Sequence, residues 1–231
     1  MQHPQWEKAR DRETLARKLA EHVAYLLAAQ LATRDRVSLA VSGGSTPALF
    51  FQYLSRCVLP WQRVSIVPVD ERWVALGSDQ ANESLIRAHL LQGEAGGADF
   101  VSLLGEANDP SEAVRRANER LAGIAMPLTA AILGMGGDGH TASWFPGDPA
   151  SGQALSDEAV SGYCVTRAPS PPHTRLTLSW PCIRDATHCL LHVHGDDKRH
   201  VLEKALSAAD AAPRFPVRRL LERPLSVFWS P

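Results

Sequence analysis

Residues 134–140, here called the His140 loop, place one histidine and one aspartate among several glycines. The loop follows an apolar run, and His140 comes two positions after Asp138. An imidazole has an unperturbed pKa near neutrality and can exchange a proton at physiological pH. Glycines let the backbone approach a ligand closely and adopt positive φ angles. The loop could therefore hold a cofactor or perform acid–base chemistry through His140.

The cofactor interpretation depends on a formal match to G-x-G-x-x-G between Gly134 and Gly139. A dinucleotide fingerprint must open directly into a helix whose amino end receives the pyrophosphate. The segment from Trp144 to Pro149 follows instead and allows a helical turn or two at most. The match also comes late in the chain rather than in its first strand–helix unit. We therefore favour catalysis by His140, with Asp138 as its partner, and expect no cofactor.

Residues 42–47, the Ser42 loop, carry the features of a phosphate site. They lack the lysine of a nucleoside-triphosphate loop, so a phosphate monoester is the expected ligand. Backbone N–H groups, hydroxyl groups and the amino end of a following helix bind such anions, although a simple connecting turn has the same composition. We expect Thr46 to cap that helix and Pro47 to lie in its first turn. The expected phosphate ligands here are Ser42, Gly43, Gly44, Ser45 and Thr46.

Two cationic side chains are expected to complete the phosphate site. Arg72 follows two acidic residues and could form a local ion pair or a bidentate contact with phosphate. Lys198 lies in the first turn of an expected helix, where a cation opposes the helix dipole and so indicates a nearby anion. Arg167 and Arg175 are alternatives for a further phosphate contact. Possible substrate contacts are Asp70, Gly136 and Arg175.

The elements that must position these residues alternate along the chain. Apolar runs predict strands at 37–41, 64–69, 129–133, 189–193 and 225–228. Helical patterns occupy 5–31, 48–55, 82–91, 111–124 (with Ser111 as the cap), 196–206 and 217–221. This alternation predicts an α/β fold: a mostly parallel, doubly wound, Rossmann-like sheet with helices on both faces. We expect a single domain over residues 1–231.

Two further expectations concern how this sheet is used. Residues 151–180 are rich in Ser, Gly and Pro and carry β-like runs at 159–166 and 175–178, which predicts a small β-containing insertion. Ligands of open α/β sheets bind at the carboxyl ends of the strands. The Ser42 loop, residues 70–72 and the His140 loop all follow expected strands. We therefore expect them to form one composite site.

Composition excludes several other classes of function. The formal net charge of −1 gives no indication of a nucleic-acid or membrane partner. Four scattered cysteines predict reduced thiols, and the polar amino-terminal segment and short apolar runs favour a cytoplasmic protein. His192 and His194 would share a strand face near His188, but no cysteine or carboxylate completes a zinc set, so we expect no metal.

The chain resembles the 6-phosphogluconolactonases in six segments, namely 40–47, 70–74, 78–82, 134–146, 175–178 and 195–198. The resemblance implies hydrolysis of 6-phospho-D-glucono-1,5-lactone to 6-phosphogluconate, the second oxidative step of the pentose phosphate pathway, without a cofactor. It implies that His140 takes a proton from water and returns it to the leaving ring oxygen, while Asp138 biases the imidazole or binds sugar hydroxyls. One departure is Trp144, where leucine is more usual; we expect it to alter the packing beside His140.

Two rival functions are considered. Glucosamine-6-phosphate deaminases are similar, but have Asp-Glu-Tyr in place of residues 70–72 and an acidic group shortly after the histidine that residues 141–146 lack. A sugar-phosphate sensor would usually carry a DNA-binding helix-turn-helix, for which we see no segment. We expect a small-molecule sugar-phosphate lactone as the partner, no nucleic acid and no membrane, and a monomer or weak homo-oligomer.

Overall fold

The computed structural model describes residues 3–105, 107–207 and 215–231. Met1 and Gln2, part of the polar amino-terminal segment, lie outside the described residues. The strands are β1 (Gln5–Lys8), β2 (Val37–Val41), β3 (Val64–Pro68), β4 (Asp70–Arg72), β5 (Asp99–Phe100), β6 (Ala130–Leu133), β7 (Tyr163–Arg167), β8 (Thr174–Leu178), β9 (His188–His194) and β10 (Ser226–Ser230). The helices are α1 (Arg12–Leu31), α2 (Ala48–Leu54), α3 (Asn82–His89), α4 (Pro110–Leu121), α5 (Pro149–Ala154), α6 (Trp180–Arg184) and α7 (Asp196–Ser207), with 3-10 turns η1 (Trp61–Arg63), η2 (Gly93–Gly97) and η3 (Pro216–Glu222).

The main sheet has the order β1-β10-β9-β6-β2-β3-β5, and all of its pairs are parallel. From β2 the chain moves outward to β3 and β5, then returns to place β6 on the other side of β2. The order therefore reverses between β2 and β6, which is where open α/β sheets bind ligands. The predicted mostly parallel α/β fold is confirmed.

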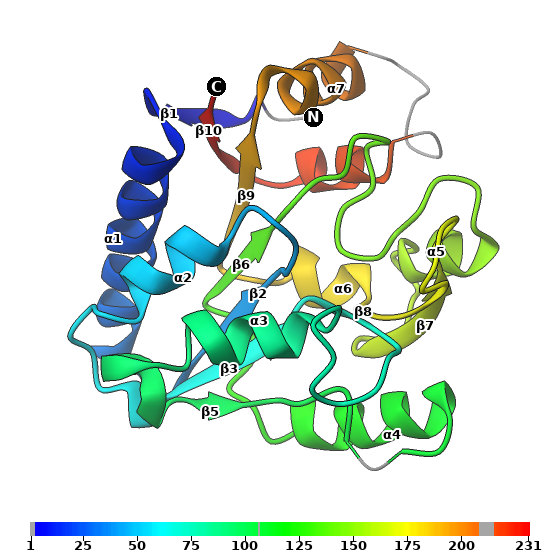
Figure 1. The fold of residues 1–231 in the computed structure, drawn as a ribbon, viewed down its shortest axis with the longest axis horizontal. Helices are drawn as coiled ribbons and strands as arrows, with labels where there is room; N and C mark the ends of the chain where they lie inside the picture. The colour runs from blue at the N-terminus through cyan, green and yellow to red at the C-terminus, as the bar shows by residue number, and fades with distance from the viewer. Residues whose placement is uncertain (1–2, 106, 208–214) are drawn as a thin grey trace.

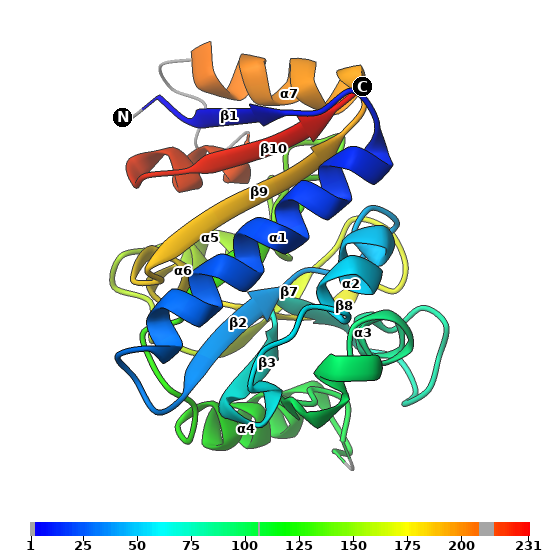
Figure 2. The ribbon, with the colours of Figure 1, turned by 90° about the vertical axis from the view of Figure 1, so that its left-hand side faces the viewer.

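Helices and loops bury both faces of this sheet. Figure 2 shows α1 lying across one face of the sheet, with α2 and α3 on the side where strands such as β2 end. On that face apolar residues of α1 and α2 pack with strand residues such as Leu39, Ile66 and Leu190. On the opposite face, Ala131, Leu133 and Leu191 pack against a second core. Alternate residues of each strand thus enter different cores, which is why the strands read as continuous apolar runs.

The insertion predicted near 151–180 is confirmed as part of a small antiparallel sheet. Its order is β4-β8-β7, so the β7–β8 hairpin pairs with residues that directly follow β3. The hydroxyl of Tyr163 donates to the carbonyl of Pro68 at 2.6 Å and ties the hairpin to the main sheet. Residues 70–72 are therefore a strand of their own, rather than the loop that the sequence suggested. Figure 1 shows β7 and β8 beside α5, away from α1.

The amino-terminal prediction was wrong for residues 5–11. Gln5–Lys8 form an edge strand parallel to β10, and the helix begins only after Asp11, whose carboxylate accepts the Thr14 N–H at 2.7 Å. Helical periodicity detects the apolar stripe of α1 but not the pairing of an edge strand with a partner over 200 positions away.

Two predicted helix caps and one helix type also differ. Pro47 occupies the cap position of α2 itself, and Thr46 makes no capping hydrogen bond there. Asp109, not Ser111, caps α4 and accepts two backbone N–H groups. The expected helix at 217–221 is a 3-10 segment, η3, and the short helix α6 was not predicted.

None of the described helices is long and apolar enough to cross a membrane.

Candidate active site

One cavity of about 420 Å³ opens at the carboxyl ends of β2, β6 and β9, beside the point where the strand order reverses. The Ser42 loop and the His140 loop form two of its sides, and β4 and the start of α7 contribute the others. Segments far apart in sequence therefore meet at one place, as expected for a composite site. The predicted residues that line it are Ser42, Gly43, Gly44, Ser45, Thr46, Asp70, Arg72, Gly136, His140 and Lys198.

The His140 loop folds into a compact turn that presents the imidazole to the cavity. The Gly136 N–H donates to the His140 carbonyl at 2.9 Å, and the Gly139 N–H donates to the Gly136 carbonyl at 3.1 Å. Gly139 has φ near +82°, a conformation that side chains other than glycine rarely adopt. A Cβ at Gly136 would lie 2.2 Å from the Cε1 atom of His140. Any side chain at position 136 would therefore displace the His140 ring, and only glycine leaves room for it.

Asp138 holds this ring through Nδ1 rather than lining the cavity itself. Its Oδ1 atom lies 2.5 Å from His140 Nδ1 and also accepts the His140 backbone N–H at 3.1 Å. Burial alone would raise the pKa of Asp138, but these two hydrogen bonds outweigh it and keep the pKa below its usual value. The carboxylate therefore stays ionised, and Nε2 is the ring nitrogen left for chemistry.

Hydrogen bonds between loops anchor the segment that follows His140. The Thr141 hydroxyl donates to the Gly134 carbonyl at 2.7 Å, and the Ser143 hydroxyl donates to Asp70 Oδ2 at 2.6 Å. Trp144 is fully buried and donates its indole N–H to Leu178. Trp144 contacts Trp180, and the ring of the next residue, Phe145, lies against His140 at 4.9 Å; that Trp144 alters the packing beside His140 stays a prediction.

The Ser42 loop contacts the His140 loop directly and contacts β4 through Asn82. The Gly134 N–H donates to the Ser42 hydroxyl at 3.4 Å, which joins the loops that follow β2 and β6. A Cβ at Gly43 would lie 2.0 Å from Oδ1 of Asn82, so that side chain packs directly on the loop backbone. Asn82 in turn donates to the Asp70 carbonyl at 2.9 Å. No local pattern marks Asn82 as a site residue, although it ends the matching segment 78–82.

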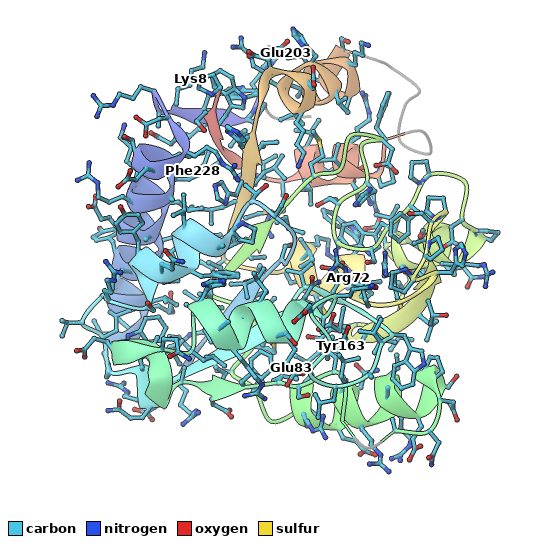
Figure 3. The ribbon with its side chains drawn as sticks, in the orientation of Figure 1. Lys8, Arg72, Glu83, Tyr163, Glu203 and Phe228 are labelled. Carbon is cyan, nitrogen blue, oxygen red and sulfur yellow. The ribbon has the colours of Figure 1, made fainter. Side chains whose placement is uncertain are left out.

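Glu71 organises the β4–α3 connection beneath Arg72. Its buried carboxylate accepts the backbone N–H groups of Arg72, Asn82 and Glu83, each at 2.7 Å. The Arg72 guanidinium donates to the Gln80 carbonyl at 2.6 Å, and Figure 3 shows Arg72 near the middle of the molecule, above α3. These contacts hold Arg72 at the wall of the cavity.

Neither alternative arginine lines the cavity. Arg175 is paired with Arg72 across β8 and β4, and its buried Nη1 has no hydrogen-bond partner among the described residues. Burial, and then the charge of Arg72, lower the pKa of Arg175. Arg167 ends β7, is exposed and donates its backbone N–H to Asp148. Substrate contact by Arg175 stays a prediction.

Two cations lie beside the Ser42 loop: one lines the cavity and the other contacts the loop backbone. Lys198, in the first turn of α7, lines the cavity, and burial followed by the charge of Arg12 lowers its pKa. Arg12, at the start of α1, donates to the Ser45 carbonyl at 3.3 Å. Like charges placed together beside N–H and hydroxyl groups favour an anionic ligand. Arg12 was missed in the sequence because nothing local connects it with residues 33 positions later.

The chain is similar to known proteins over nearly its whole length. Residues 10–229 match the family described as glucosamine-6-phosphate isomerases/6-phosphogluconolactonase. The chain belongs to this family. It is 40% identical to a 6-phosphogluconolactonase of Rhizobium meliloti over 94% of each chain. It is 39% identical to one of Pseudomonas aeruginosa, over 94% of this chain and 90% of the relative.

A solved structure of the family has the same fold. The 6-phosphogluconolactonase of Shewanella baltica superposes with a TM-score of 0.94 and 36% identity, covering 99% of this chain and 98% of the other. The architecture described above, including the small antiparallel sheet, is thus that of the family.

The histidines of β9 do not form a metal site. Among the described residues, no group of three or more His, Cys, Asp or Glu side chains is arranged to hold a metal ion. His194 makes a 3.1 Å contact with the Ser230 hydroxyl, whereas His192 lines the cavity. The residue pattern indicated His192 only as a possible metal ligand, and its place in the cavity wall follows from the tertiary structure.

Proposed function

We propose that the chain hydrolyses 6-phospho-D-glucono-1,5-lactone to 6-phosphogluconate. The observation that carries the proposal is that the Asp138–His140 pair opens onto the same cavity as Lys198 and the Ser42 loop. One end of the cavity thus offers an acid–base group and the other an anion site. The 6-phosphogluconolactonases among its relatives support this assignment.

Binding begins with the phosphate group. The Ser42 loop supplies N–H and hydroxyl donors, and Lys198 and Arg72 supply positive charge. These contacts are remote from the bond that breaks, so their binding energy serves to orient the lactone carbonyl towards His140. Asp70 has its oxygens engaged by Ser143 and Asn82, which suits a role in shaping the cavity or accepting a sugar hydroxyl.

His140 then acts as general base and general acid in turn. With Nδ1 bonded to Asp138, Nε2 takes a proton from a water molecule while the water oxygen attacks the lactone carbonyl carbon. The tetrahedral intermediate collapses by breaking the bond between that carbon and the ring oxygen. The proton on Nε2 passes to the departing ring oxygen, which becomes the hydroxyl of the open chain. The imidazole returns to its starting state.

The oxyanion of the intermediate needs N–H donors close to the carbonyl. The N–H groups of Gly134, Gly136 and Gly139 are already engaged within the site. Those of Met135 and Gly137, in the same loop, are the donors that we propose. Met135 lines the cavity, which supports its backbone N–H as one of these donors.

Acid release from freshly made 6-phosphogluconolactone tests the proposal. We expect turnover by the wild-type chain and a fall in kcat of about a thousandfold in His140→Ala, with product binding retained, because the general base and acid are lost. An unchanged kcat in His140→Ala would overturn the mechanism. Ammonia release from glucosamine 6-phosphate would instead identify a deaminase, and saturable lactone binding without turnover would identify a sensor.

We also propose that the chain works in the cytoplasm, as a monomer or weak homo-oligomer, on this small-molecule substrate alone. The four cysteines are all unpaired, which is typical of proteins kept in a reducing compartment. Cell fractionation tests the compartment, and sedimentation velocity at micromolar concentration tests the state of association.

A further inference from the structure

His192 is a buried polar side chain that the mechanism above does not use. It lies near the carboxyl end of β9, with 6% of its surface exposed, and it lines the cavity. Its ring packs edge-on against Phe50 at 6.0 Å. No hydrogen-bond partner for the ring is found among the described residues. The ring nitrogens are not among the fully buried unpartnered atoms of the described residues, so the small exposed part of this ring opens onto the cavity, where its nitrogens can hydrogen-bond a ligand.

The charged groups that face His192 are cationic. They are Arg12 from α1 and Lys198 from α7; His194 follows on the same strand, but burial lowers its pKa and favours the neutral ring. Burial, and then these neighbours, lower the pKa of His192 to about 4. The ring is therefore neutral at physiological pH and carries one N–H donor and one acceptor nitrogen.

We propose that His192 is a phosphate-binding residue of this site, whose imidazole donates an N–H to the substrate phosphate beside Lys198. The proposal rests on the proposed function, which supplies the phosphate monoester. Phosphate is favoured over a sugar hydroxyl because Lys198 faces the same ring, and Arg12 joins this end of the cavity to the Ser42 loop through the Ser45 carbonyl. Because the ring stays neutral at physiological pH, its N–H donor adds a hydrogen bond to the phosphate without adding a further positive charge beside Lys198.

A purely structural role would require only an apolar side chain at this position. Leu190 precedes His192 on the same face of β9 and belongs to the core there. Leucine at position 192 would continue that core without an unpartnered nitrogen. The two roles therefore predict different outcomes for His192→Leu, which fills the space, and His192→Gln, which keeps a neutral N–H donor.

The experiment measures binding and turnover separately. Calorimetry with inorganic phosphate and with 6-phosphogluconate gives Kd, and acid release from phosphorylated and unphosphorylated gluconolactone gives kcat and KM. For His192→Leu we expect Kd and KM for phosphorylated ligands to rise about tenfold, since one hydrogen bond to a charged group is lost. The kcat should change less than about twofold, as should kcat/KM for the unphosphorylated lactone. His192→Gln should recover most of the affinity.

His194→Leu is the matched control, because His194 lies two residues further along the strand but does not line the cavity. It should leave phosphate binding unchanged. Equal losses for both lactones, or unchanged phosphate binding in His192→Leu, would overturn the proposal. Because phosphate binding is measured without turnover, a chain that binds phosphate through His192 but does not hydrolyse the lactone would contradict only the proposed function. In NMR spectra, the His192 ring resonances should shift when phosphate is added at pH 7.

Discussion

Asp138 and His140 are joined twice within one turn: the same Oδ1 atom lies 2.5 Å from the ring Nδ1 and 3.1 Å from the backbone N–H of His140. Both contacts fix the ring relative to its own backbone, independently of the rest of the cavity. The pair therefore behaves as one acid–base unit. Because Gly136 has no side chain, it leaves the space that the His140 ring occupies.

The first prediction concerns this pair. Asp138→Asn keeps the size of the side chain but replaces a charge that stabilises the imidazolium formed during the reaction. We expect kcat to fall by at least about tenfold, with KM for the lactone changed much less. Steady-state acid release measures both. A variant with wild-type kcat would show that Asp138 does not support the proton transfers of His140.

Gly136 provides a test of ring position. In Gly136→Ala the new Cβ would lie 2.2 Å from Cε1 and 2.3 Å from Nδ1 of His140, so the ring has to move. A displacement of about 1 Å can lower a rate roughly 100-fold, and we expect a loss in kcat of that order. Gly137→Ala is the control, because a Cβ there meets nothing within 4 Å and alanine keeps the backbone N–H that we propose as an oxyanion donor. Similar losses in both variants would argue against a positional effect.

Arg72 is predicted to act in binding rather than in chemistry. Removing its guanidinium in Arg72→Ala should raise KM about tenfold or more and leave kcat within about threefold, because a charge-assisted phosphate contact is lost. Arg72→Lys keeps the charge but not the fork and should lie in between. A normal KM in Arg72→Ala would remove this residue from the phosphate site. Arg115→Ala, in an exposed ion pair on α4, controls for general charge effects.

Glu71 should make stability depend on pH. Burial raises its pKa from 4.5 to about 7, although three backbone N–H donors favour the carboxylate. Between these pH values the folded chain holds a proton that the unfolded chain releases, so the free energy of unfolding falls as pH rises through this window. The full difference corresponds to roughly 3 kcal/mol.

Urea unfolding of the wild type and Glu71→Gln at several pH values isolates this titration. Comparison of the two chains is needed because His192, with its lowered pKa, shifts stability in the opposite direction over part of the same range. We expect the wild-type advantage over Glu71→Gln to shrink as pH rises from 5 to about 8. An advantage that grows with pH would mean that the backbone donors outweigh burial and hold the pKa of Glu71 below 4.5.

Local patterns were sufficient for most of the architecture. The apolar runs at β2, β3, β6 and β9 are buried on both faces, so each is visible as a continuous apolar segment. The edge strand β1 has mostly exposed side chains and is held by its pairing with β10. No periodicity within residues 5–8 can reveal that pairing, and the helix was therefore extended too far.

The sequence by itself determined the fold class and the chemistry-bearing loops, because a glycine loop after a buried strand is encoded by neighbouring residues. Only the tertiary structure decided which other side chains join those loops: Arg12 bonds Ser45 from α1, Asn82 bonds Asp70 from α3, and His192 lines the cavity from β9. It also removed Arg175 from the wall of the cavity and placed Phe145, not Trp144, against His140. Such contacts depend on side-chain packing and long-range hydrogen bonds, which no local pattern of residues specifies.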